Sequence, residues 1–203
     1  IKEGQSSVIP GSGVDINRFN VKRTVNKGLN FLFVGRLIGD KGIREYLEAS
    51  LEVSSLYPDV NFLIIGELGY NNKTAISEEE LQNYLNKTSQ IKYLGKTDRI
   101  EDVLEGVDVM VLPSYREGLS RSLLEAASMS LPIVTTDVPG CREVVIDEMN
   151  GYLCEKANSQ SLKSKIIDMI KIGEKKRLDM GKNGRLMVEE KFSEEIIVWH
   201  YSR

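Results

Sequence analysis

Two glutamates after an apolar run are the residues in this chain best placed to do chemistry. Glu117 and Glu125 are separated by seven residues and follow the apolar run Asp108–Leu112. The pattern predicts a strand, a glycine-bearing loop and a helix that starts near Ser120. Backbone N–H groups and the positive end of that helix would then face an anionic ligand. We expect one carboxylate in the loop and the other inside the helix.

Each glutamate also has an ordinary explanation. Glu117 alone could be a solvated loop charge, and Glu125 alone an ordinary helix residue. Glu125, however, stands among leucines and alanines, where an unpaired buried carboxylate is costly. A carboxylate inside such a helix can accept hydrogen bonds from a ribose diol, as an acidic residue does in dinucleotide-binding folds. The spacing first suggests the carboxylate pair of glycoside hydrolysis, but separate sugar contacts fit the two positions better.

A second candidate site follows an earlier apolar run. The stretch Phe33–Gly42 places Arg36 and Lys41 in a loop and first turn that lead into a helix. Two cations at a helix start suit a diphosphate, because arginine can bind phosphate oxygens in a fork and lysine adds a point charge. A lysine there is repelled by the helix dipole, which favours an anion between them.

Composition limits the function classes. The chain has 203 residues, 41% hydrophobic and 28% charged, with a net charge of −3 and a pI near 5.4. A dedicated nucleic-acid binder would normally carry a basic surface, so we expect no nucleic-acid partner. No apolar run reaches the ~20 residues of a transmembrane helix. Cys141 and Cys154 lack metal-ligand spacing, so we expect two core thiols in a reducing compartment.

The order of apolar runs predicts an α/β fold. Continuous runs that alternate with helical stretches are typical of a Rossmann-like, doubly wound parallel sheet of about six strands flanked by helices. The predicted strands are Leu29–Val34, Val60–Ile65, Ile91–Leu94, Val107–Leu112, Pro132–Thr135 and Gly151–Cys154. The predicted helices include Ile43–Tyr57, Leu81–Thr88 behind a capping box at Ser77–Glu80, and Glu189–Tyr201. A polar loop, Gly66–Ser77, is predicted to be a flap or an insertion.

The chain starts at Ile1, and we expect it to be a fragment. Residues 1–27 are predicted to connect to a missing N-terminal domain. Residues 28–188 are predicted to form the ligand-binding domain. Residues 189–203 are predicted to form a terminal helix, whose Ile196 and Trp199 suit packing either on the missing domain or on the local core. For His200 we expect solvation or packing, since no histidine-based triad or zinc site can be assembled.

Together the two loops carry a family resemblance. The matching segments are Gly13–Asp15, Val34–Leu37 with Lys41-Gly42, Glu117–Ser120 with Glu125-Ala126, and Asn150–Leu153. In this order they resemble the retaining glycosyltransferases of family 4 (glycosyl transferases group 1), which have the GT-B fold. The stretches Pro113–Ala127 and Thr135–Glu143 look like bacterial enzymes that build polysaccharide or lipid-linked glycans. The chain resembles the C-terminal, donor-binding half.

The resemblance implies a role for each matching residue. Arg36 and Lys41, with Gly35, would hold the donor diphosphate, and Glu117 would contact the transferred sugar. These cations and Glu117 would be the catalytic residues. Glu125 would bind the ribose. The remaining donor contacts would come from Gly118, Leu119 and Ser120 near the sugar and phosphate, and from Gly95, Lys96 and Thr97 at the base. Without an Asp-x-Asp motif, we expect metal-independent chemistry and no cofactor.

The implied reaction moves a hexose or N-acetylhexosamine from a nucleotide diphosphate sugar, most simply a UDP-sugar, to a glycan or polyprenyl-linked acceptor. We expect a cytoplasmic protein, and peripheral association of the full-length protein with the membrane stays open. The isolated fragment is expected to be inactive. A non-catalytic sugar-nucleotide-binding module remains an alternative. An oxidoreductase is disfavoured, because no strand is followed by Gly-x-Gly-x-x-Gly.

Overall fold

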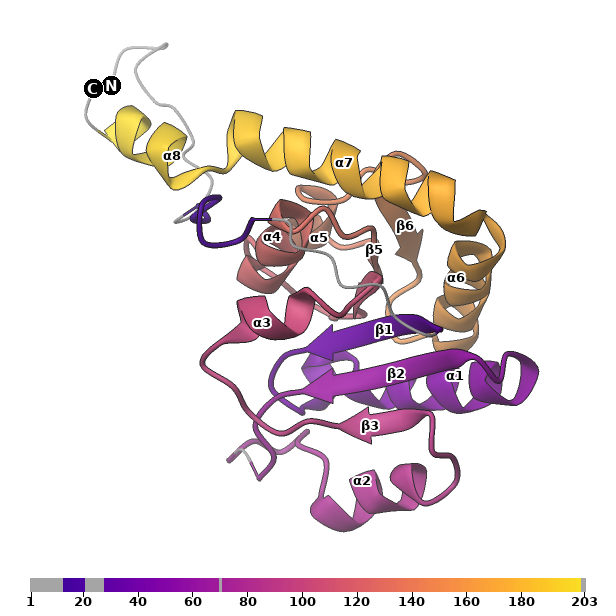
Figure 1. The fold of residues 1–203 in the computed structure, drawn as a ribbon. Helices are drawn as coiled ribbons and strands as arrows, with labels where there is room; N and C mark the ends of the chain where they lie inside the picture. Colours follow the sequence, from indigo (N-terminus) through magenta and orange to yellow (C-terminus); the bar gives the residue numbers. More distant parts are fainter. Residues whose placement is uncertain (1–12, 21–27, 70, 202–203) are drawn as a thin grey trace.

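The computed structural model describes residues 13–20, 28–69 and 71–201, with the backbone alone at 199–201. The expectations for residues 1–12 and 21–27, and for the side chains of Trp199 and His200, lie outside this description. The predicted α/β fold is confirmed, with six parallel strands in the order β3-β2-β1-β4-β5-β6 (Figure 1). The strands are β1 Leu29–Val34, β2 Val60–Ile65, β3 Ile91–Tyr93, β4 Val109–Leu112, β5 Ile133–Thr136 and β6 Gly151–Cys154.

The strands form because their apolar side chains are covered on both faces of the sheet. All four residues of β4 are buried, and Phe31, Leu32 and Phe33 of the neighbouring β1 are fully buried. Strand starts differ slightly from prediction. β4 begins two residues after Val107, because the carboxylate of Asp108 accepts a hydrogen bond from the N–H of Asn30 at 2.9 Å.

The strand order places a topological switch between β1 and β4. From β1 the chain adds β2 and β3 on one side, then returns to add β4, β5 and β6 on the other. In such sheets ligands bind beyond the carboxyl ends of the strands at the switch. The loops that follow β1 and β4, which carry the predicted site residues Arg36, Lys41 and Glu117, therefore lie at the position favoured for a ligand.

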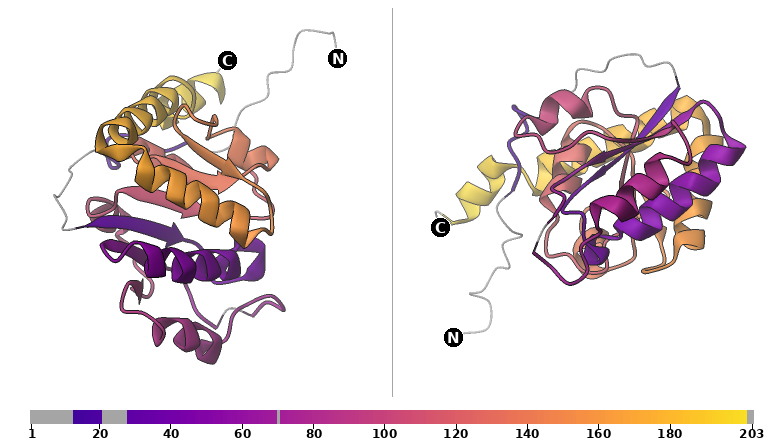
Figure 2. Two further views of the ribbon diagram at one scale, coloured as in Figure 1. Left: turned by 90° about the vertical axis from the view of Figure 1, so that its right-hand side faces the viewer. Right: turned by 90° about the horizontal axis from the view of Figure 1, so that it is seen from below.

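Helices cover both faces of the sheet. α1 and α6 pack against each other, and α4 packs against α7 (Figure 2). Besides the short 3₁₀ helix η1, Gly39–Lys41, the helices are α1 Ile43–Leu56, α2 Glu78–Leu85, α3 Ile100–Leu104, α4 Arg121–Ser128, α5 Pro139–Arg142, α6 Ser159–Lys171, α7 Gly173–Lys191 and α8 Glu194–Tyr201. Cys141 and Cys154 are free and buried, as expected.

Two helix predictions need correction. The helix predicted at Leu81–Thr88 begins a turn earlier, at Glu78. Ser77 caps it by accepting a hydrogen bond from the N–H of Glu80 at 3.0 Å. The carboxylate of Glu80 does not complete the capping box. It binds the guanidinium of Arg44 through two hydrogen bonds of 2.6 and 2.8 Å.

The terminal helix predicted at Glu189–Tyr201 is two helices. α7 ends at Lys191 and α8 starts at Glu194. The break forms because Val14 binds the backbone there: its N–H donates to Phe192 at 2.9 Å, and its carbonyl accepts from Glu194 at 3.1 Å. The segment 13–20 is therefore held against the α7–α8 junction. In the loop predicted at 66–77, the described residues 66–69 and 71–77 form no helix or strand.

Gly42 fixes the distance between the two loops at the switch. It is the N-cap of α1 with φ +74°, and a Cβ added there would lie 2.1 Å from the carbonyl oxygen of Pro113. No side chain fits in that space. The β1–α1 turn can therefore lie directly against the β4–α4 loop only if this position is glycine.

We predict that Gly42→Ala destabilises the protein much more than Gly69→Ala. Gly69 also has φ +74°, but an added Cβ there meets nothing within 4 Å, so Gly69→Ala measures the backbone strain alone. That strain should cost ~1 kcal/mol. Gly42→Ala should cost about 2 kcal/mol more, because two backbones must move apart. Urea denaturation of both variants measures the difference, and equal losses would contradict the close approach.

Candidate donor-binding site

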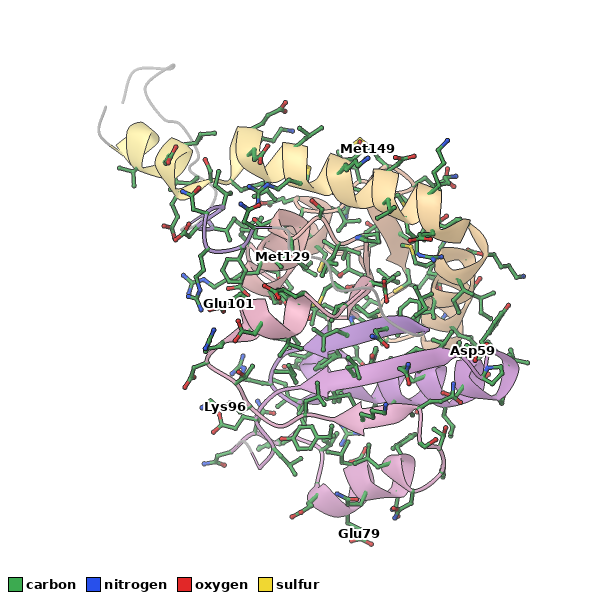
Figure 3. All side chains as sticks on the ribbon, viewed as in Figure 1. Asp59, Glu79, Lys96, Glu101, Met129 and Met149 are labelled. Atoms are coloured by element: carbon green, nitrogen blue, oxygen red, sulfur yellow. The ribbon has the colours of Figure 1, made fainter. Side chains whose placement is uncertain are left out.

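The site lies at the carboxyl edge of β1 and β4, where two loops are joined through their backbones. The N–H of Tyr115 donates to the carbonyl of Asp40 at 2.8 Å, next to the contact between Gly42 and Pro113. Residues 35–42 and 113–120 thus form one continuous surface. In Figure 3, Lys96 and Glu101 lie at this edge of the sheet, whereas Asp59 lies at the opposite edge.

The structure brings Lys41 and Glu117 into direct contact. The Nζ of Lys41 lies 2.5 Å from Oε1 of Glu117, and the two side chains are only 20% and 9% exposed. The hydroxyl of Ser114 donates to the same carboxylate oxygen at 2.6 Å. A cation, a carboxylate and a hydroxyl from two loops therefore form one cluster. Lys41 ends η1 rather than lying in the first turn of α1, which begins at Ile43.

Ser114 joins the site although no sequence pattern singles it out. Ser114 is fully buried, two residues after β4 and three before Glu117. Its backbone carbonyl accepts a hydrogen bond from the hydroxyl of Thr136 at the end of β5, so the position of Ser114 is fixed from the neighbouring strand. A small hydroxyl residue between a strand and a candidate site carboxylate was the only sequence signal.

Gly140 packs against the β4–α4 loop. A Cβ at Gly140, in α5, would lie 1.6 Å from the carbonyl oxygen of Gly118, so α5 packs backbone to backbone against the loop. Gly118 itself is exposed, while Leu119 is half-buried against the core. Ser120 is the N-cap of α4, as predicted, and is buried. Its hydroxyl lies 3.3 Å from that of Ser122 and makes no cap bond to the helix backbone.

The β1–α1 turn places Arg36 at the surface. Gly35 donates its N–H to Ile65 at 3.0 Å, which extends the pairing of β1 with β2. Arg36 is exposed in the turn that follows, and its carbonyl accepts from the N–H of Ile38 at 2.8 Å. Arg36 and Lys41 thus stand on the same short turn, with Arg36 exposed and Lys41 largely covered.

The loop predicted to hold the base lies at the same edge, after β3. Gly95 has φ +77° and its carbonyl accepts from the N–H of Gly66 at 2.9 Å. Lys96 forms a long, exposed ion pair of 3.8 Å with Glu67. The hydroxyl of Thr97 accepts from the N–H of Arg99 at 3.1 Å. Gly95 and Lys96 thus contact the β2–α2 loop, whereas Thr97 binds a backbone group further along its own loop.

Glu125 occupies a pocket that includes the N-terminal segment. The pocket, of about 170 Å³, is lined by Glu125 and Arg121 of α4, by Glu194 of α8, and by residues Gly13, Val14, Asp15, Arg18 and Phe19. Burial raises the pKa of Glu125 to about 6, against the opposing effect of Arg121 and Arg18. Arg18 also binds Glu101 of α3 at 2.9 Å. The sequence predicts this segment only as a connector, so its contribution to the pocket is visible only in the structure.

The described part of the chain contains neither a metal-site cluster nor a membrane-spanning helix. Among the side chains of residues 13–20, 28–69 and 71–198, no three histidine, cysteine, aspartate or glutamate residues are grouped as a metal site would require. None of the helices in the same ranges is long and apolar enough to cross a bilayer.

We predict that Glu125→Gln stabilises the protein at neutral pH. The pKa of Glu125 is about 6 in the folded state against an ordinary value of 4.5, so the folded state retains a proton between these pH values that the unfolded chain has lost. Stability from this group therefore falls as the pH rises from 4.5 through 6, and the ionised carboxylate destabilises the fold above that. The neutral amide removes the penalty.

Thermal denaturation at pH 7.5 and pH 5 measures this effect. The Tm of Glu125→Gln should exceed that of the wild type at pH 7.5, and the gain should shrink at pH 5. The gain should stay below ~2 kcal/mol, because solvent screens a partly exposed group. Glu174→Gln, at an exposed position of α7, is the matched control. A lower Tm for Glu125→Gln at pH 7.5 would contradict the burial penalty.

Comparisons with known proteins agree with this architecture. The chain is 30% identical over 186 residues to the capsular polysaccharide biosynthesis glycosyltransferase CapM of Staphylococcus aureus, covering 91% of this chain and 48% of CapM. It is 29% identical over 214 residues to the N,N'-diacetylbacillosaminyl-diphospho-undecaprenol alpha-1,3-N-acetylgalactosaminyltransferase of Campylobacter jejuni, covering 99% of this chain and 54% of that enzyme. The chain therefore spans about half the length of these relatives.

A solved structure shows the same fold. HepE of Anabaena, determined in complex with UDP, superposes with a TM-score of 0.81 at 20% identity, covering 94% of this chain and 54% of HepE. The family model described as "Glycosyl transferases group 1" matches residues 15–187, which contain both loops of the site and most of the segment that lines the Glu125 pocket. The chain belongs to the glycosyl transferases group 1 family.

Proposed function

We propose that this chain is the donor-binding half of a retaining glycosyltransferase that uses a UDP-sugar. The single observation that carries the proposal is the apposition of two loops at the carboxyl ends of β1 and β4. One loop bears Arg36 and Lys41, and the other bears Glu117. The cations match a diphosphate and the carboxylate matches sugar hydroxyls, so one bound nucleotide-sugar can use both.

The proposed reaction breaks the bond between the anomeric carbon and the diphosphate oxygen. Negative charge then grows on the leaving diphosphate, where Arg36 and Lys41 would neutralise it in place of a metal ion. The acceptor hydroxyl would attack the anomeric carbon from the face that the diphosphate leaves, and its proton would pass to an oxygen of the leaving phosphate. Attack from this face retains the configuration at the anomeric carbon. Glu117 would orient the hexose or N-acetylhexosamine through its hydroxyls.

The nucleoside would lie along the edge from α4 toward the β3–α3 loop. With a pKa of about 6, Glu125 is mostly ionised at pH 7.5 and can accept hydrogen bonds from both ribose hydroxyls. The base would then approach Gly95, Lys96 and Thr97, while the N–H groups at the start of α4 face the sugar or the phosphates. HepE, which shares the fold, has been solved with UDP, and this supports the choice of uridine.

The acceptor is proposed to be a glycan or a polyprenyl-linked sugar. The Campylobacter jejuni relative is named as a transferase acting on a diphospho-undecaprenol-linked sugar, and CapM is named for capsular polysaccharide biosynthesis. Such an acceptor would place the whole protein in the cytoplasm at the inner face of the membrane. Because the chain spans about half of these relatives, we propose that it binds the donor but does not transfer the sugar alone.

We predict that the chain binds UDP in the presence of EDTA and that Lys41→Ala weakens this binding at least about tenfold. The loss follows from removing one charge-assisted hydrogen bond, worth ~1.5–3 kcal/mol. Isothermal titration calorimetry of both proteins measures it. Lys171→Ala is the matched control, because Lys171 is exposed at the end of α6, by the opposite edge of the sheet. Equal affinities of wild type and Lys41→Ala would refute the diphosphate site.

We also predict that Glu125→Ala weakens binding of UDP more than binding of 2′,3′-dideoxy-UDP. The dideoxy compound lacks the hydroxyls that Glu125 would accept from, so it should lose little when the carboxylate is removed. Calorimetry with both ligands on both proteins gives the four affinities needed. The ribose role is wrong if the substitution weakens both ligands by the same factor.

A further inference from the structure

We propose that Glu117 acts as an internal counter-anion for Lys41 and that a donor diphosphate must displace it. This inference rests on the proposed function and adds to it. It assigns the Lys41–Glu117 ion pair a role in the affinity for the diphosphate. Glu117 then competes with the β-phosphate for the lysine before it contacts the sugar.

Lys41 and Glu117 are in direct contact in the structure. Lys41 is proposed to bind phosphate and Glu117 to bind the sugar, yet their side chains lie 2.5 Å apart in the structure. Both are largely covered, so solvent screens this pair less than a pair on an open surface. A phosphate oxygen that binds the Nζ of Lys41 therefore competes with a carboxylate oxygen that already holds the same ammonium group.

Backbone contacts hold the loops of Lys41 and Glu117 together. The Gly42–Pro113 contact and the Tyr115–Asp40 hydrogen bond hold the two loops together on either side of the pair. Only the side chains are free to reorganise. The two loops consequently stay together, and a diphosphate that binds there meets both side chains.

A hydrogen bond from Ser114 holds Glu117 independently of Lys41. Its hydroxyl donates to Oε1 of Glu117 at 2.6 Å, the same oxygen that Lys41 contacts. When the lysine turns to a phosphate, Ser114 still holds the carboxylate, so Glu117 keeps its orientation toward the ligand. A largely buried carboxylate that loses its cation needs new donors, and the hydroxyls of a transferred sugar can supply them. UDP carries no such sugar and leaves this cost unrelieved.

The expected consequence is that removing the charge of Glu117 tightens the binding of UDP. Glu117→Gln should bind UDP roughly fivefold more tightly than the wild type, the upper range for partly exposed ion pairs. This gain in UDP affinity should disappear when Lys41 is also replaced by alanine, because no lysine is then left for which Glu117 and the phosphate compete. A sugar-contacting residue with no link to Lys41 would leave UDP affinity unchanged.

The test is a double-mutant cycle in UDP affinity. Calorimetry in EDTA at one salt concentration compares the wild type, Glu117→Gln, Lys41→Ala and the double variant, and the thermal shift at millimolar UDP extends the range for weak binders. Glu174→Gln is the control for the same loss of charge at a distant exposed position. Thermal denaturation without UDP confirms that each variant is folded.

The outcomes separate the two proposals. A gain for Glu117→Gln that depends on Lys41 supports the competition. An unchanged or weaker affinity for Glu117→Gln overturns it, as does an equal gain with and without Lys41, which would indicate long-range repulsion instead. If the wild type does not bind UDP at all, the proposed function is overturned and this inference with it.

Discussion

The close approach of two backbones at the end of β1 and β4 sets the rest of the site. Gly42 lies against the carbonyl of Pro113, and Tyr115 donates its N–H to Asp40. Because no side chain separates these loops, Lys41 and Glu117 meet although they are far apart in sequence. The parallel sheet, with its switch between β1 and β4, brings these two loops to one edge.

Much of this could be predicted from the sequence, since each strand is a short run of buried apolar residues. The continuous apolar runs at Leu29–Val34 and Val60–Ile65 predicted the first and last residues of both strands correctly. The helix start at Ser120 followed from the glycine-bearing loop before an apolar helix. The loops bearing Arg36, Lys41 and Glu117 could then be placed at one edge, because parallel strands end on the same side.

Other features could not be predicted, because they depend on contacts between distant segments. The break between α7 and α8 is caused by Val14, which lies far away in the chain. Glu80 was predicted to cap its own helix, but Arg44 of another helix offers a charged partner with two hydrogen bonds. The direct contact of Lys41 with Glu117, held by Ser114, requires a loop geometry that no local pattern specifies.

The most direct test of the central claim is chemical-shift mapping of the ¹⁵N-labelled chain during a titration with UDP. A donor site at the switch predicts that the largest changes fall in residues 35–42, 95–97 and 114–125, which would contact the diphosphate, the base and the ribose of UDP. The groove lined by Ile146, Met149 and Leu186, the last of which belongs to α7, should stay unchanged. Changes concentrated in that groove, with residues 35–42 unaffected, would contradict the account.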